Sequence, residues 1–260
     1  MRLVFFYQIV GDTPEGQIAE NYWLVTNRHV IYNTDASRKE ILVDMLVFKV
    51  RYDDKNTGTV QWIDVRLDKI ELQKKAKVHT DDKIDVAVID IYEAFTKATN
   101  TIAEENTVYV NPITEKHLPD QSKFPIEVCD DTVCIGYPRG FYDTSNLYPV
   151  AKSGIIASEW GANFSGDPRF LIDLQLFPGS SGSLVITKPR REDLDDKGFL
   201  IWKQSKVFSF LGIYSGEPVT YRTVKRPDGT ERTIELTYNF GNVWYSWLVP
   251  EIIDHGVLVK

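Results

Sequence analysis

The sequence predicts an all-β fold made of two antiparallel β-barrels, and three observations support this prediction. Most of the chain consists of short apolar or alternating segments separated by turn residues, which is typical of barrels and sandwiches. A 260-residue chain that is 43% hydrophobic and 12% aromatic can fill one large core or two smaller ones. The polar segment NPITEKHLPDQSKFPIE (111–127) divides the strands into two comparable sets. We therefore expect barrels over residues 1–118 and 119–260, together forming one domain.

The first set of strands precedes the proline-containing segment. Its helical content is small: we expect one turn of helix at 27–31 and a short helix at 91–97. The expected strands are RLVFFYQIV (2–10), YWLVT (22–26), MLVFKVRYD (45–53), TVQWIDVRL (59–67) and VAVIDIY (86–92).

The second set follows that segment and ends in a short helix after Pro250, because proline suits the first helical position. KPRREDLDDKG (188–198) is expected as a long surface loop, and RPDG (226–229) as a turn inside a hairpin. The expected strands are TVCIGYP (132–138), LYPVAKSGIIAS (147–158), RFLIDLQLF (169–177), SLVIT (183–187), KVFSFLGIYSG (206–216), VTYRTV (219–224) and RTIELTYNF (232–240).

Charge and hydropathy exclude several classes of partner. The net charge is −7 and the pI is near 5.2, with lysine and arginine scattered along the chain, which argues against a nucleic-acid surface. No apolar run approaches the length of a membrane span, and the start MRLVFFYQIVGDTPEG lacks the features of a secretory signal. We expect a cytoplasmic protein that binds a protein or peptide and contacts neither nucleic acid nor membrane.

The two cysteines are Cys129 and Cys134. We expect buried free thiols, with a disulfide as the alternative, since disulfides are rare in the cytosol. A CxxxxC spacing with no nearby histidine is a poor zinc signal. No metal or organic cofactor is expected.

The stretch FPGSSGSLV (177–185) contains serines, one of which could be a catalytic nucleophile. It lies between two strand-like segments with no change in composition, so a linker here would cut a β-domain in half. It is then either a tight turn or a loop that presents a reactive serine. A serine hydroxyl is a weak nucleophile near neutral pH, so it needs an imidazole base and a third group that orients the imidazole.

Of the four histidines, His29 has the setting that this chemistry needs. It directly follows the apolar strand YWLVT, in a short helical turn at the edge of the first barrel. A structural role remains the alternative for this residue. The other three, His79, His117 and His255, lie in polar segments that favour solvated or capping roles.

The best candidate for the orienting carboxylate is Asp85. It heads the strand in KIDVAVIDIY, at the boundary between barrel and loop. Asp81 and Asp82 fall in a polar run, and Asp90 follows the apolar core positions, which makes these three weaker candidates.

Together, WLVTNRHV, DVAVIDI and FPGSSGSLV resemble the histidine, aspartate and serine motifs of trypsin-like (chymotrypsin-fold) serine peptidases, and they occur in that family's order. VCIGYPRG and AKSGIIAS resemble the strands before the nucleophile in the bacterial HtrA-type branch. FLGIYSGE resembles the strand after it that lines the substrate cleft. The resemblance covers roughly residues 1 to 255 and leaves no segment for a PDZ domain.

The resemblance implies a serine endopeptidase in which Ser181 is the nucleophile, His29 the general base and Asp85 its orienting carboxylate. The backbone N–H groups of Gly179 and Ser181 would form the oxyanion hole. Glycine suits this position because the backbone must turn an N–H toward developing negative charge.

The chain departs from the family at Ser180, which stands where many members have an aspartate that pairs with a newly cut N-terminus. Activation by N-terminal cleavage is therefore not expected. A regulatory partner or ligand that reorganises residues 177–181 is a hypothesis.

The resemblance places the floor of the specificity pocket at Gln175, opposite Tyr214, Ser215, Gly216 and Glu217. The neutral Gln175 gives no support for a preference for arginine or lysine. Glu217 either attracts a basic side chain or is an ordinary exposed loop residue. By similarity, Ser215 is expected to hydrogen-bond Asp85.

Three other interpretations compete with this one. The α/β-hydrolase elbow requires G-x-S-x-G, and Ser183 stands where its last glycine belongs, which excludes that class. A catalytically silent module that binds a protein partner is the rival, with a collapsed oxyanion loop or a cleft covered by residues 188–198. An enzyme dedicated to a single protein substrate is the third possibility.

Overall fold

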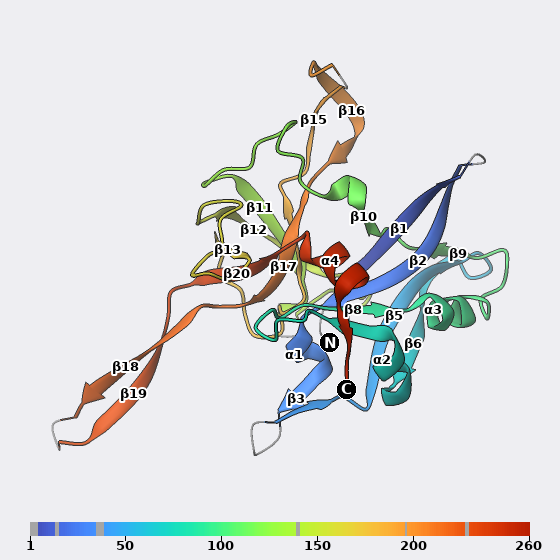
Figure 1. Ribbon diagram of the computed structural model, residues 1–260. Helices are drawn as coiled ribbons and strands as arrows, with labels where there is room; N and C mark the ends of the chain where they lie inside the picture. The colour runs from blue at the N-terminus through green and yellow to red at the C-terminus, as the bar shows by residue number, and fades with distance from the viewer. Residues whose placement is uncertain (1–4, 14–15, 35–38, 139–140, 196, 227–228) are drawn as a thin grey trace.

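The structure is a computed structural model that describes residues 5–13, 16–34, 39–138, 141–195, 197–226 and 229–260 (Figure 1). Strands account for most of the described elements, and the helices are short. The predicted all-β class is confirmed. Among the described residues, no helix is both long and apolar enough to cross a membrane.

The N-terminal half consists of two main sheets and a small hairpin. The first sheet has the order β10–β1–β2–β8–β7–β21, and the second has the order β6–β5–β9. The strands are β1 (Phe5–Thr13), β2 (Gly16–Thr26), β7 (Ala76–Val78), β8 (Ala87–Asp90), β10 (Ile113–Thr114) and β21 (Val257–Leu258); β5 (Met45–Asp54), β6 (Thr59–Asp68) and β9 (Thr107–Tyr109); and the hairpin β3 (Tyr32–Thr34) with β4 (Glu40–Leu42).

One apolar core joins the two N-terminal sheets. Leu24 and Ile89 from the first sheet pack in the same cluster as Val50 and Leu67 from the second. The short helix α2 (Lys69–Lys75) adds the fully buried Leu72 to this cluster. The sequence prediction missed α2, although Asp68 and Glu71 form the reciprocal capping box that signals such a start.

The C-terminal half contains a closed six-stranded barrel with the order β11–β12–β13–β20–β17–β14, in which β14 pairs back to β11. Its interior is apolar and holds Phe170, Val185, Leu211 and Tyr245. The strands are β11 (Asp131–Gly136), β12 (Val150–Ile156), β13 (Arg169–Asp173), β14 (Leu184–Thr187), β17 (Phe210–Gly216) and β20 (Phe240–Tyr245).

Two hairpins project from this barrel in different directions (Figure 1). The first pairs β15 (Arg190–Leu194) with β16 (Leu200–Val207), and the second, which we call the β18–β19 arm, pairs β18 (Val219–Lys225) with β19 (Glu231–Thr237). The prediction of a loop over 188–198 was therefore wrong over 190–194. Solvent reaches much of this hairpin, so its sequence lacks the apolar alternation that marks a half-buried strand.

The predicted turn at 226–229 falls in the gap between β18 and β19. Residues 227 and 228 lie outside the described residues. On either side of them, the Arg226 N–H donates to the Thr230 carbonyl, which is consistent with a hairpin.

The chain returns to its N-terminal half at the end. Helix α4 (Leu248–His255) starts two residues before the predicted Pro250, which occupies the third helical position, where no intrahelical N–H donor is needed. Leu248 and Ile252 of α4 pack with Trp23 of β2 and Phe210 of β17 in a core that joins both halves. Strand β21 then pairs with β7, so the last residues complete the first sheet rather than the C-terminal barrel. The other helices are α1 (Arg28–Ile31) and α3 (Tyr92–Thr99).

Candidate active site

His29 and Asp85 are in direct contact. The Nδ1 atom of His29 lies 2.7 Å from Oδ2 of Asp85, and the backbone N–H of His29 donates to Oδ1 of the same carboxylate at 2.9 Å. Both carboxylate oxygens therefore hold one residue, which fixes the position of its backbone and the orientation of its ring. The His29 side chain is 45% exposed and that of Asp85 25%, so the imidazole can still reach a ligand.

Strand pairing explains how residues 56 positions apart meet. Thr26 at the end of β2 is paired with Ala87 at the start of β8, so the chain after β2 runs beside the chain before β8. Helix α1 starts immediately after β2 and carries His29.

Asn27 ties these two segments together and was missed by the sequence prediction. It is fully buried, and its Nδ2 donates to the carbonyl of Asp85 at 2.7 Å. The bond fixes the backbone from which the Asp85 carboxylate projects. A polar residue between an apolar strand and a histidine, as in VTNRHV, is the signal that would have found it.

The weaker candidates have structural contacts. Asp81 accepts the Lys83 N–H and Asp90 accepts the Tyr92 N–H, which are local turn contacts. His117 accepts the Thr114 N–H in a cap and stacks on Phe208, and burial lowers its pKa. Among the remaining candidates, His79 contacts Glu251 through Nε2, whereas Asp82 and His255 are exposed.

Ser181 lies on the loop between β13 and β14, and backbone hydrogen bonds hold this loop. The N–H of Gly182 donates to the Tyr214 carbonyl at 2.9 Å, and the Tyr214 N–H donates to the Ser183 carbonyl at 3.0 Å. The N–H of Ser180 donates to the Phe177 carbonyl within the loop. These contacts anchor the loop to β17.

Glycine is required at Gly179, where φ is +93°, a region that residues with a Cβ rarely adopt. The side chain of the next residue, Ser180, is directed into the protein and is 1% exposed. Its Oγ has no hydrogen-bond partner among the described residues. The loop geometry thus depends on glycine and on main-chain contacts.

The core that joins the two halves relates the Ser181 loop to the His29–Asp85 pair. This core contains Val25, which lies two residues before Asn27, and Val86, which follows Asp85. Leu184, three residues after Ser181, packs against the same core. Residues that adjoin the His29–Asp85 pair and residues that follow Ser181 therefore contribute to the same apolar core.

A cleft of 310 Å³ has Ser181 in its wall. Of the residues expected to recognise substrate, Tyr214, Gly216 and Glu217 line it. Ser215 does not line this cleft, and neither does Gln175, which is exposed and accepts a hydrogen bond from Lys152 through its carbonyl oxygen. The remaining walls come from Leu176, Phe177, Pro178 and, in the β18–β19 arm, Val219, Glu235 and Thr237.

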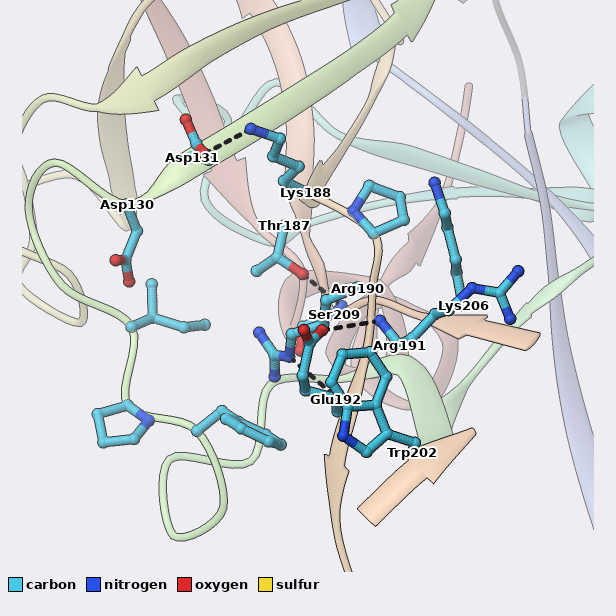
Figure 2. A pocket seen from close by; sticks show the side chains of 14 residues that line it. Asp130, Asp131, Thr187, Lys188, Arg190, Arg191, Glu192, Trp202, Lys206 and Ser209 are labelled. Carbon is cyan, nitrogen blue, oxygen red and sulfur yellow. Dashed lines mark hydrogen bonds and ion pairs between the residues drawn. The ribbon is translucent and has the colours of Figure 1, made fainter. Parts of the chain in front are cut away.

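The β15–β16 hairpin lines a different hollow. That hollow, of 560 Å³, lies between the hairpin and the segment before β11, and Figure 2 shows Trp202, Arg190 and Lys188 around it. No described residue from 188 to 198 lines the cleft at Ser181. The suggestion that this segment covers the cleft therefore has no support in the structure.

The cysteines differ in exposure. Both are free, which agrees with the predicted thiols, but Cys129 is exposed rather than buried. Its positive φ of 77° places it in a tight turn before β11. Cys134 points into the barrel core, and burial raises the pKa of its thiol to about 12.

Comparison with known proteins gives a family and a distant structural likeness. Residues 15–191 match the family model of the trypsin-like peptidase domain. No curated protein sequence matches the chain. The crystal structure of a scabies mite inactivated protease paralogue, S-I1, is 12% identical, with 94% of this chain and 90% of that chain covered and a TM-score of 0.39.

Proposed function

Because the chain belongs to the trypsin-like peptidase domain family, we propose that it is a serine endopeptidase that forms an acyl-enzyme on Ser181. The observation that carries this proposal is the contact of both Asp85 carboxylate oxygens with His29. A base held in this way has one imidazole nitrogen committed to the carboxylate, while the other can accept a serine proton.

His29 acts as the general base in the proposed mechanism. With Nδ1–H donated to Asp85, the Nε2 atom is the acceptor for the proton of the Ser181 hydroxyl. The Ser181 oxygen then attacks the substrate carbonyl, and the imidazolium formed is stabilised by the adjacent carboxylate. The same proton passes to the leaving amine when the peptide bond breaks, and water releases the acyl group by the reverse sequence.

The backbone N–H groups of Gly179 and Ser181 stabilise the oxyanion in this mechanism. The amides of Ser180 and Ser183 donate within the loop and that of Gly182 donates to Tyr214, whereas those of Gly179 and Ser181 make no such backbone bond with a described residue. Two amides in this position beside the proposed nucleophile suit a developing negative charge.

A fluorophosphonate tests this proposal directly, because the reagent phosphonylates only a serine that a base has activated. The protein is incubated with the probe and its intact mass is measured, with Ser181→Ala as the control. An adduct on the unsubstituted protein that the variant lacks supports the enzyme. Absence of an adduct overturns it and leaves the catalytically silent binding module.

A further inference from the structure

The cleft beside Ser181 carries negative charge from Glu217, which the sequence analysis considered, and from Glu235, which it did not. Its described lining includes two carboxylates, Glu217 and Glu235, and no lysine, arginine or histidine. Glu217 is half-buried rather than an ordinary exposed loop residue. Negative charge in a confined cleft attracts a cationic group.

Glu235 reaches the cleft because of the register of the β18–β19 arm. Val219 is paired with Thr237 and Tyr221 with Glu235, and residues paired in this way share one face of an antiparallel ribbon. All three arm residues in the cleft wall, Val219, Glu235 and Thr237, belong to that face. The opposite face contains the half-buried Ile234 and Leu236. The face with Glu235 is thus the one presented to the cleft.

Neither carboxylate is neutralised by an ion pair with a described residue, whereas each of the two projecting hairpins contains an acidic residue that is paired. At the far end of the same face of the arm, Glu231 lies 3.9 Å from the Lys225 ammonium. Asp193 of the β15–β16 hairpin is paired with Lys203. The cleft beside the proposed nucleophile therefore holds two carboxylates that have no ion-pair partner among the described residues.

Lys152 lies against one residue of the cleft wall, Phe177, and its ammonium is bonded to the main chain. Its ammonium donates to the carbonyl of Gln175 and lies 5.3 Å from the centre of the Phe177 ring. Lys152 lines a separate small hollow together with Leu176 and Ser180, and it does not line the cleft that holds Glu217 and Glu235.

We propose that Glu217 and Glu235 select a basic side chain, arginine or lysine, in the substrate residue that adjoins the bond attacked by Ser181. This inference rests on the proposed function and extends it to the substrate class. The charge that sets the preference comes from the β18–β19 arm and the end of β17, rather than from the expected floor position, Gln175.

The first test compares cleavage of blocked hexapeptides that differ only in the residue that adjoins the cleaved bond. That residue is Arg, Lys, Gln, Leu or Glu. We expect kcat/KM to be highest for Arg and Lys. Glu217→Gln should lower kcat/KM for the Arg peptide about tenfold, because a half-buried charged contact is lost. Glu235→Gln should lower it about two- to fivefold, as for an exposed pair. Both changes should lower cleavage of the Leu peptide less than cleavage of the Arg peptide.

Glu231→Gln is the matched control, since it removes the same charge from the same face of the arm at a site that does not line the cleft. It should leave the ratio of Arg to Leu cleavage unchanged. An equal loss of kcat/KM for the Arg peptide in all three variants would overturn the inference, because it would show a general effect of negative charge. An unaltered ratio in the double variant of Glu217 and Glu235 would also overturn it.

A binding measurement separates failure of this inference from failure of the proposed function. Fluorescence anisotropy of labelled Arg and Leu peptides is measured with Ser181→Ala, which needs no catalysis. We expect tighter binding of the Arg peptide, weakened by added salt and by Glu217→Gln. If the protein forms a fluorophosphonate adduct but binds the Arg and Leu peptides equally, only the proposed site for a basic side chain is contradicted. If it binds the Arg peptide more tightly but forms no adduct, only the proposed enzymatic function is contradicted.

Discussion

The two halves of the protein hold their parts of the site in different ways. In the N-terminal half, side chains fix the proposed base: Asp85 contacts His29 twice, and Asn27 holds the backbone of Asp85. In the C-terminal half, the main chain fixes the loop of the proposed nucleophile, through bonds between Gly182, Ser183 and Tyr214 and through the positive φ of Gly179.

This difference follows from the architecture of each half. The His29–Asp85 pair lies at strand ends where pairing has stopped, so side chains must supply the remaining contacts. The Ser181 loop lies between β13 and β14 of a closed barrel, and β17 offers it backbone partners. We therefore expect the N-terminal part to be sensitive to side-chain chemistry and the C-terminal part to backbone conformation.

Asp85→Asn tests the side-chain part of the comparison and should give the largest effect. The amide keeps the shape of the carboxylate but removes the charge that stabilises an imidazolium, and it favours the wrong tautomer of His29. We expect kcat to fall about 10⁴-fold at neutral pH with little change in the free energy of unfolding. Peptide cleavage and urea unfolding measure the two quantities.

The control for this substitution is Asp81→Asn, which changes a carboxylate four positions earlier whose contact with the described residues is a local turn bond. Its activity should match the unsubstituted protein. A loss of less than about tenfold in Asp85→Asn would show that Asp85 does not orient the base.

Gly179→Ala tests the backbone side of the comparison and should give the second largest effect. Alanine rarely adopts a φ near +93°, so the peptide unit that carries the proposed oxyanion donor must turn. Loss of one such donor lowers kcat by about 10² to 10³. The measurement is steady-state cleavage of a small ester or peptide.

Gly198→Ala separates conformational strain from the loss of a donor. Gly198 also has a positive φ, +81°, and an added Cβ there meets no atom within 4 Å. It precedes β16, away from the cleft. Both alanine variants should lose similar stability, whereas only Gly179→Ala should lose activity. Equal activity in the two would show that Gly179 does not shape an oxyanion hole.

Much of the fold could be predicted from sequence because apolar alternation marks half-buried strands. β5, β6 and β14 lie within one residue of their predicted bounds. The β15–β16 pairing was missed because exposed hairpins need no such pattern. Helix α2 was missed because its one buried residue, Leu72, gives almost no apolar periodicity.

The candidate site, too, could be predicted from sequence only in part. Motif order pointed to His29 and Asp85, which the structure places in contact, since strand ends keep such residues near each other. Glu235 could not be predicted, because its place in the cleft wall depends on the register of the arm. Gln175 was assigned by counting back from Ser181, and the structure turns its side chain to solvent.

Ser180→Ala should give the smallest effect and completes the comparison. If the main chain alone holds the nucleophile loop, its buried hydroxyl contributes no contact, since Oγ has no partner among the described residues. Removing an unsatisfied buried hydroxyl should raise the free energy of unfolding by about 1 kcal/mol. We expect kcat/KM to change less than about threefold. Urea unfolding and peptide cleavage check both values, with Ser122→Ala, whose exposed hydroxyl donates to Asp120, as a surface control. A loss of stability or activity in Ser180→Ala would show that a side-chain contact does hold this loop, and the two halves would then be built alike.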